Sequence, residues 1–360
     1  MIIVDGHRDI AYDFIDLGRD YGRSVAETRA LEANVSRPRL KGPALTGLPD
    51  AIDAGIALVN AVIFVEPAEF ESWGSEPADP DSKIVYRTPQ EAEQRALEQI
   101  EWYKGFGSQQ PTVQMVYTAQ DLDDALATWA PEADPARRKQ GMVLLMEGAD
   151  PMVEPSQFAE WWERGVRILG TSWTRTRYAG GTRAPGPLTD LGRALLKEMA
   201  KFNALLDLSH MAEESALESL RSYAGPIFAS HANPRAFSNT DRHLSDETIK
   251  LLAERDGVMG LVMLNLFWAH PGEPHDHIPF ARVLDAVDYI CQLTGSARHV
   301  GLGTDWYAGM GAGESPDELD SVADLPKIAV GLAERGYSQS DVEAIMGGNM
   351  LRKIREALPA

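Results

Sequence analysis

Eight short apolar runs recur along this chain of 360 residues, and most of them are followed by a segment with helical character. The runs are rich in β-branched residues and cover residues 2–6, 57–65, 142–147, 166–171, 204–209, 227–230, 258–265 and 299–304. Because buried strands that alternate with helices pack as a parallel sheet, eight such units predict an α/β fold, a closed (β/α)8 barrel. A shorter run at residues 113–117 predicts an extra strand or a connection. No repeat or linker divides the chain, so we expect residues 1–360 to form a single domain.

Two long polar connections interrupt the alternation of strands and helices. One covers about residues 18–50 and is rich in Arg, Gly and Pro, and the other covers about residues 66–90 and contains Trp73. Long loops of a barrel usually border the active site and shape its pocket. These two segments are therefore either a lid over a site or passive insertions at the surface.

The clearest helix lies near the end of the chain. Ser338 and Ser340 precede the run VEAIMGGNMLRKIREAL, and either serine suits an N-cap. The pair Gly347-Gly348 lies inside this run and predicts a break or a kink, because glycine is a weak helix former.

Charge and cysteine content exclude several classes of partner and site. The formal net charge is −20, from 54 acidic and 34 basic residues, so we expect neither nucleic acid nor an anionic membrane as a partner. The single cysteine, Cys291, excludes an internal disulfide and a cysteine-based zinc site. No apolar run approaches the ~20 residues that span a bilayer, and no secretory signal is recognisable, so we expect a cytoplasmic protein.

Residues that suit a metal site or acid–base catalysis stand at the ends of several apolar runs. In chain order they are His7 and Asp9, Glu147, His210, His231 and Asp305. In a barrel, the carboxyl ends of all strands meet on one face, where catalytic groups gather. One such ending could be a solvated turn, but five separate endings predict a common site.

The first five of these residues are more than one zinc ion requires, since a catalytic zinc takes three protein ligands and a water. The set divides into two ions, with His7 and Asp9 on one, His210 and His231 on the other, and Glu147 spanning both. Two ions ~3.5–4 Å apart can share a hydroxide and polarise a carbonyl group. Asp305 remains, either as the acceptor of the water's proton or as a sixth ligand.

The chain resembles the membrane (renal) dipeptidase family of dinuclear zinc peptidases, within the amidohydrolase-type barrels. The resemblance rests on DGHRD, MEGAD, LLDLSHM, FASHANPRAFSNTDRHLSDE, VGLGTDW and DLPKIAVGLAERGYSQSDVEAIMGGNMLRKI, which extend over almost the whole chain. It implies a dipeptide substrate, often with a D-residue at the C-terminal position, two Zn²⁺ ions, and a homodimer. The metal ligands that it implies are His7, Asp9, Glu147, His210 and His231. It also implies that Asp305 transfers the proton and that Arg242 binds the substrate's carboxylate. A guanidinium suits this last role, because its planar fork pairs with a carboxylate.

One position departs from the family pattern. Many members have a histidine after the fourth strand that helps polarise the substrate carbonyl, whereas this chain has Trp173 in the segment GTSWTRTRYAGGT. An indole donates one hydrogen bond and carries no proton charge. Three alternatives remain. Trp173 donates a hydrogen bond to the carbonyl oxygen as it becomes negatively charged, or a metal polarises the carbonyl alone, or the substrate differs from that of the family. Arg175 and Arg177 add positive charge nearby, which predicts a preference for an acidic group on the substrate.

Two rival functions stay open at this point. The nearer is another amide hydrolase, which would act on N-acyl amino acids or cyclic amides with the same metals. For either reaction, manganese or cobalt would suit the site as well as zinc. The further one is a non-catalytic metal-binding or scaffold protein, against which the complete ligand set argues. A second histidine cluster, AHPGEPHDH, contains His270, His275 and His277 and is either a metal site or, more simply, a solvated loop.

Overall fold

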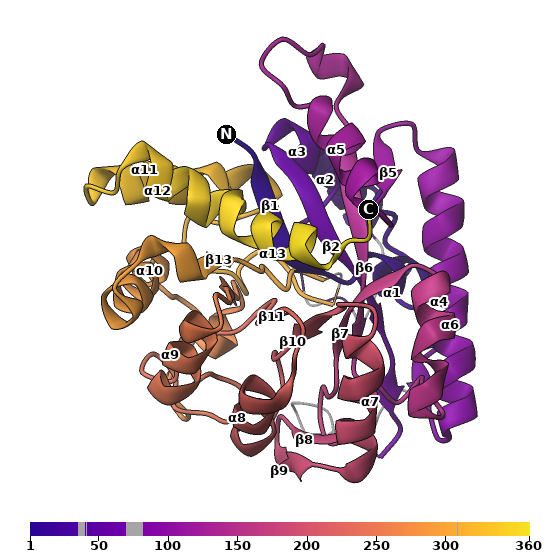
Figure 1. Ribbon diagram of the computed structural model, residues 1–360. Helices are drawn as coiled ribbons and strands as arrows, with labels where there is room; N and C mark the ends of the chain where they lie inside the picture. The colour runs from indigo at the N-terminus through magenta and orange to yellow at the C-terminus, as the bar shows by residue number, and fades with distance from the viewer. Residues whose placement is uncertain (35–39, 41, 70–81, 308) are drawn as a thin grey trace.

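The computed structural model describes residues 1–34, 40, 42–69, 82–307 and 309–360. Within these residues, eight parallel strands follow one another around a barrel (Figure 1). In chain order they are β1 (Ile3–Arg8), β2 (Ile56–Phe64), β6 (Gln140–Glu147), β7 (Val166–Gly170), β10 (Leu205–Asp207), β11 (Ile227–Phe228), β12 (Met259–Leu261) and β13 (Val300–Leu302). Each strand lies within or close to one of the eight apolar runs, so the predicted barrel is confirmed.

The strands pair in sequence order around the ring. The hydrogen-bonded order is β11-β10-β7-β6-β2-β1-β13-β12, with every pair parallel. An additional parallel bridge joins Ala229, just after β11, to Met259 in β12. This bridge connects the two ends of the sheet and closes the ring.

Burial on both faces explains why the strands read as continuous apolar runs. All nine residues of β2 (IALVNAVIF) and all eight of β6 (QGMVLLME) are buried. One face of each strand packs inside the barrel and the other lies under the surrounding helices, so neither face needs polar side chains. The polar residues of the chemistry are therefore confined to the strand ends.

Helices surround the strands, as the ribbon in Figure 1 shows. They are α1 (Ile10–Ile15), α2 (Val25–Glu32), α3 (Leu48–Asp53), α4 (Pro89–Gln109), α5 (Ala119–Ala127), α6 (Phe158–Glu163), α7 (Asp190–Ala200), α8 (Glu213–Ser222), α9 (Asp246–Glu254), α10 (Ala281–Thr294), α11 (Pro326–Glu334), α12 (Gln339–Glu343) and α13 (Asn349–Ala357). Within the described ranges, none of the helices combines the length and the apolar character that crossing a bilayer requires.

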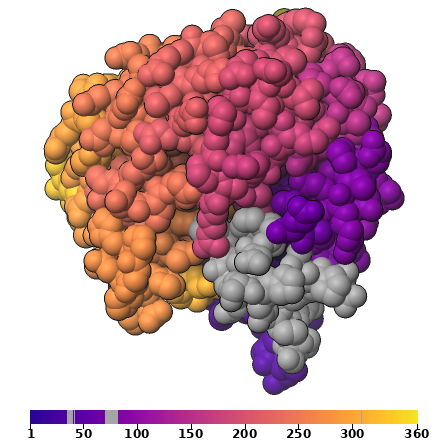
Figure 2. Space-filling model, turned by 90° about the horizontal axis from the view of Figure 1, so that it is seen from below, coloured from indigo at the N-terminus to yellow at the C-terminus, as the bar shows by residue number. Residues whose placement is uncertain are grey.

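Several short strands lie outside the ring. The predicted extra strand is β5 (Val113–Met115), which pairs with the first half of β6. Two small sheets were not predicted: β3 (Glu66–Pro67) with β4 (Val85–Tyr86), and the hairpin of β8 (Ala179–Gly181) and β9 (Ala184–Leu188). The hairpin lies at the bottom of Figure 1, and Figure 2 views the molecule from that side.

The two long predicted connections contain regular elements. Residues 18–50 include α2 and the start of α3, and residues 66–90 include β3, β4 and the start of α4. Residues 35–39, 41 and 70–81 lie outside the described residues, and with them Trp73.

The last helical segment closes the end of the barrel opposite the carboxyl ends of the strands. Ser338 caps α12 by accepting a hydrogen bond from the Asp341 N–H, as predicted. The predicted break at Gly347-Gly348 is a π-helical turn over Ala344–Gly348, which leads directly into α13. Met350 and Ile354 of α13 then pack against Val4 and other residues of the barrel interior.

Candidate metal centre

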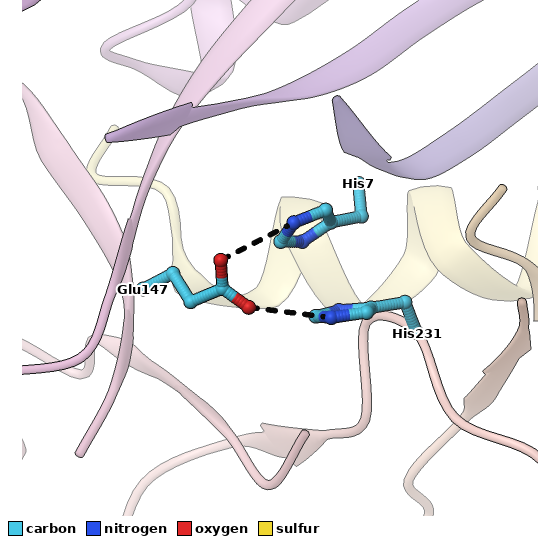
Figure 3. A group of neighbouring side chains, drawn as sticks. All are labelled: His7, Glu147 and His231. Atoms are coloured by element: carbon cyan, nitrogen blue, oxygen red, sulfur yellow. Dashed lines mark ion pairs between the residues drawn. The ribbon is translucent and has the colours of Figure 1, made fainter. Parts of the chain in front are cut away.

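Three of the predicted histidines meet around the carboxylate of Glu147 at the carboxyl end of the barrel. Glu147, the last residue of β6, directs Oε1 toward Nε2 of His210 at 3.2 Å and Nε2 of His231 at 3.3 Å. Its other oxygen, Oε2, lies 3.6 Å from His7 Nε2. Figure 3 shows Glu147 between His7, which lies on β1, and His231, which lies on the segment after β11. The two carboxylate oxygens therefore face two different groups of histidines.

The remaining two acids approach from the other side of His7. Its Nε2 atom lies 3.4 Å from Asp9 Oδ2 and 3.7 Å from Asp305 Oδ1. Two groups of possible metal ligands result, His7 with Glu147 and His231, and His7 with Asp9 and Asp305. Within each group, one ligand atom per residue lies within 4.8 Å of the others. The structure thus brings together all six residues that the strand ends predict.

A close approach of backbones carries His231 into the middle of the barrel. The carbonyl oxygen of Ser230 lies against glycines of three strand segments, and a Cβ atom at Gly303 would come within 1.9 Å of it. At Gly6 the same distance would be 2.4 Å. Because glycine leaves this space open, the chain after β11 can enter far enough for the His231 ring to contact His7, with centroids 3.6 Å apart and ring planes tilted by 35°.

The unpredicted hairpin β8–β9 supports His210. Thr182, in its turn, lies with Oγ1 3.1 Å from His210 Nδ1, and Gly181 forms a bridge with Met211. The Thr182 hydroxyl also donates to the His210 carbonyl oxygen at 3.4 Å. The hydroxyl can therefore accept from Nδ1–H, which leaves the Nε2 lone pair facing Glu147.

The unpaired atoms at the centre fit a divalent cation. His7 Nε2, Asp9 Oδ1 and Glu147 Oε1 are buried, and among the described residues none of them has a hydrogen-bond partner. The Nε2 atoms of His210 and His231 lie only 3.0 Å apart. Imidazole nitrogens and carboxylate oxygens are common ligands of zinc and similar ions, and a nearby cation would relieve the repulsion between facing lone pairs. This buried His/Glu/His group could therefore bind a metal.

Burial and neighbouring charges shift the protonation of these residues. Burial lowers the pKa of His210 to about 4, and the Arg242 guanidinium acts in the same direction. Burial, with His7 and Arg242, also holds the pKa of His231 well below its ordinary value. Both imidazoles are therefore neutral near pH 7, which is the form that binds metal.

Asp305 differs from an ordinary surface carboxyl group. Burial raises its pKa to about 7, and the charges of Asp9 and Glu147 also raise it, while His7 and Arg242 oppose the shift. A group with a pKa near the working pH can both accept and return a proton. Asp305 also has a backbone φ of 57°, in the left-handed region.

Arg242 is buried beside the cluster. Its Nη2 donates to the His231 carbonyl oxygen at 2.9 Å, and its guanidinium carbon lies 5.0 Å from the centre of the Phe267 ring. Among the described residues, its Nε and Nη1 atoms have no hydrogen-bond partner. A buried cation with free donors is a suitable binding group for an anion such as a carboxylate.

The other three predicted residues lie on the segment after β7. Trp173 is half-buried, with its ring 4.9 Å from that of Phe64 and 6.1 Å from that of His210. Arg175 is exposed and donates to the Pro185 carbonyl oxygen at 2.6 Å. Arg177 donates to the carbonyl oxygens of Met152 and Val153 and lies 3.6 Å from Asp150, which compensates its charge.

The second histidine cluster does not form a comparable group. His275 and His277 are exposed, and His277 Nδ1 lies 3.3 Å from Asp317 Oδ1. In the part of the chain that the structure describes, the two groups at the barrel end are the candidate metal sites. The solvated-loop interpretation of AHPGEPHDH therefore agrees with the structure.

Sequence reasoning missed the residues that support the histidines, namely Thr182, Asp207 and Ser230. Asp207 and Ser230 precede His210 and His231 in the motifs DLSH and ASH. The only available signal was their position at the ends of apolar runs, next to a candidate ligand.

Comparisons with known proteins identify a family. The model of the family described as membrane dipeptidase (peptidase family M19) matches residues 1–359. An uncharacterised dipeptidase of Schizosaccharomyces pombe is 32% identical over 172 residues, which cover 48% of this chain and 41% of that protein. The dipeptidase aclJ of Aspergillus oryzae is 31% identical over 198 residues, 53% of this chain and 45% of that protein. The matched regions thus span less than half of either relative.

A solved structure shares the fold over nearly the full length. It is a metallopeptidase from Rhodobacter sphaeroides liganded with a phosphinate mimic of the dipeptide L-Ala-D-Ala. The TM-score is 0.77 at 21% identity, and the match covers 99% of each chain.

Proposed function

The chain belongs to the membrane dipeptidase family, peptidase family M19, and on that basis we propose that it hydrolyses the amide bond of dipeptides in a metal-dependent reaction. The observation that carries the proposal is the position of Glu147, with one oxygen toward His210 and His231 and the other toward His7. Such a carboxylate is suited to bridge two cations. The whole chain, residues 1–360, would act as one catalytic barrel domain.

The proposed centre holds two Zn²⁺ ions. His7 and Asp9 would bind one ion, His210 and His231 the other, and Glu147 both, although manganese or cobalt would suit the same ligands. When bound, the ions supply Lewis-acid polarisation of the substrate carbonyl and lower the pKa of water.

Asp305 is the proposed acid–base residue. Its carboxyl oxygen lies 3.7 Å from His7 Nε2, next to the ligand cluster, and its pKa of about 7 suits proton transfer in both directions. It would accept a proton from the attacking water and return it to the leaving nitrogen.

Arg242 is the proposed anchor for the substrate's terminal carboxylate. The unpartnered Nε and Nη1 atoms of this buried guanidinium support the assignment. An L-Xaa-D-Xaa dipeptide is the expected substrate class, because the family resemblance implies tolerance of a D-residue at the C-terminal position. Trp173 would donate its indole N–H to the developing oxyanion, in the place of the family histidine. Of the two nearby arginines, Arg175 is the better partner for an acidic substrate group, because Asp150 compensates Arg177.

Hydrolysis of another amide, in an N-acyl amino acid or a cyclic amide, is the second candidate function. Trp173 favours it, because an indole cannot carry the proton charge that a histidine in this position could carry. The same metal ligands would serve this reaction, and the substrate pocket would differ.

The cellular setting in this proposal is cytoplasmic, with a small-molecule substrate and without nucleic acid or membrane as partner. The excess of acidic residues supports the exclusion of both polyanions. A homodimer is part of the proposal through the family resemblance alone.

A substrate panel on metal-reconstituted protein tests these functions. It should contain L,L- and L,D-dipeptides, N-acetylated forms of the same dipeptides, N-acyl amino acids and cyclic amides. We expect turnover of the free dipeptides, little turnover of the other compounds, and about two metal ions per chain by elemental analysis. His210→Ala should remove most of this activity, whereas His275→Ala, in the exposed loop, should retain it. Preferential turnover of N-acyl amino acids would contradict the dipeptidase proposal.

A further inference from the structure

Behind His231 lies a buried carboxylate that no step of the proposed reaction uses. Asp207, the last residue of β10, is buried and directs its side chain toward the segment after β11. Its Oδ1 atom accepts the backbone N–H groups of Ser209 at 2.9 Å and Ser230 at 2.8 Å. Its Oδ2 atom accepts the hydroxyl proton of Ser230.

The same hydroxyl contacts the metal-side histidine. Ser230 Oγ lies 2.6 Å from His231 Nδ1, on the opposite side of the ring from Nε2, which faces Glu147. A serine hydroxyl carries only one proton, and an ionised carboxylate can only accept. Ser230 Oγ also lies 3.2 Å from Ser209 Oγ, whose hydroxyl can donate to it. Because the Ser230 hydroxyl proton is directed to Asp207, its oxygen accepts the Nδ1–H of His231.

We infer that Asp207 and Ser230 are positioning residues that fix the tautomer of His231. The chain of hydrogen bonds from Nδ1–H through the hydroxyl to the carboxylate leaves the lone pair on Nε2, which is the atom available to a metal. The negative charge of Asp207 also makes the imidazole a better ligand. The assignment rests on the proposed metal centre and names two residues that set its affinity.

The other two histidines lack this arrangement. His210 Nδ1 contacts the neutral hydroxyl of Thr182, and His7 Nδ1 has no hydrogen-bond partner among the described residues. Among the three histidines, only His231 is thus supported by a carboxylate. Loss of this carboxylate should lower the affinity for the ion held by His210 and His231 more than the affinity for the other ion.

The substitution Asp207→Asn separates this role from simple packing. Asparagine has nearly the same shape, but its amide nitrogen would donate to Ser230 Oγ. The serine would then donate its own proton to His231 Nδ1, which would move the histidine's proton to Nε2. Asp207→Asn should therefore weaken metal binding more than Ser230→Ala, although it removes no atom from the core.

The test combines two readouts on the metal-free protein. Nitrogen-15 NMR of labelled histidines reports the tautomer of His231, assigned by the signal lost in His231→Gln, and titration with Zn²⁺ or Co²⁺ reports the affinity of each site. We expect the Nδ1–H form in the unmodified protein and the Nε2–H form in Asp207→Asn. Affinity for one of two ions should fall by about 10–100-fold in Ser230→Ala and by more in Asp207→Asn.

Ser219→Ala is the matched control, because Ser219 is a buried serine of α8 with no hydrogen-bond partner for its hydroxyl among the described residues. It should bind both ions as the unmodified protein does. Unchanged tautomer and affinity in Asp207→Asn would overturn the inference, as would equal weakening in Ser219→Ala. Since neither readout uses dipeptides, a failed substrate panel would refute the proposed reaction without affecting this result.

Discussion

Two residues of the site have a left-handed backbone conformation, which residues other than glycine rarely adopt. His210 has a φ of 65° and Asp305 a φ of 57°, and each follows the end of a barrel strand. Such a conformation costs on the order of 1 kcal/mol or more, and it persists where the surrounding structure requires it. At both positions the turn directs a side chain back over the barrel end toward Glu147 and His7.

Asp305→Asn tests the acid–base role without adding backbone strain, because asparagine tolerates the left-handed conformation well. The amide keeps the shape of the side chain but cannot accept a proton. We expect kcat for the dipeptide substrate to fall at least 100-fold, with metal content and melting temperature nearly unchanged.

Glu318→Gln is a suitable control, because Glu318 also has a positive φ, of 72°, and is exposed. Its activity should match that of the unmodified protein. If Asp305→Asn kept its turnover, Asp305 would be at most a ligand or a structural residue.

The sequence predicts which residues gather at the barrel end, but not the residues that support them, for a physical reason. His231 stands at the end of an apolar run, and this position alone directs it to the catalytic face. The contact between Asp207 and Ser230, which are 23 residues apart in the sequence, depends on the register between β10 and β11. Arg177 presents the same difficulty, since its charge in the sequence gives no sign of its pairing with Asp150.

At the scale of elements, the site depends on how closely β1 and the segments around β12 and β13 approach Ser230. Gly303 stands just after β13, where a Cβ atom would lie 1.9 Å from the Ser230 carbonyl oxygen. A backbone oxygen cannot move aside as a flexible side chain can, so the segment that carries His231 would have to shift.

We therefore expect Gly303→Ala to lower the free energy of unfolding by about 1–3 kcal/mol or more, as overpacked interiors do, and to weaken metal binding as well. Gly105→Ala is the matched control, because Gly105 lies in α4 with nothing within 4 Å of the added Cβ. That change should stabilise by up to ~1 kcal/mol. Urea denaturation measures both, and equal stability of the two variants would contradict the crowding argument.

At Gly347, the sequence predicts that the helix is irregular but not which irregularity it has. A glycine pair predicts a weak point in a helix, and the structure has a π-helical turn there. A Cβ atom at Gly347 would lie 2.9 Å from the Ile2 carbonyl oxygen. It would also lie 3.1 Å from the backbone nitrogen of Val4 in β1, and this close contact with the first strand is a feature that the local sequence cannot reveal.

For the whole molecule, the barrel could be predicted because its eight strands are buried on both faces and read as apolar runs. The hairpin β8–β9 could not, since its sequence AGGTRAPGPL has the composition of a loop. This hairpin nevertheless carries Thr182, which contacts His210, so an element without a sequence signal forms one side of the site.

The stability of the whole molecule should depend on metal only in part. The apolar interior of the barrel, which includes Met350 and Ile354, contains none of the proposed metal ligands, so the metal-free protein should stay folded. The carboxylates of Asp9, Glu147 and Asp305 nevertheless gather in a buried cluster, where their charges repel one another unless cations are bound.

Removal of metal by a chelator should therefore abolish hydrolysis, leave the far-ultraviolet circular dichroism spectrum unchanged, and lower the melting temperature. A ligand present at 100 times its Kd stabilises a protein by about 2.7 kcal/mol, which corresponds to an upward shift of the melting temperature by roughly 4 °C for a chain of 360 residues. Readdition of Zn²⁺ should restore both properties in the unmodified protein and in His275→Ala, but not in His210→Ala. Full activity after elemental analysis has shown that no metal remains would mean that the cluster at Glu147 works without a cation, and its unpaired atoms would then need another explanation.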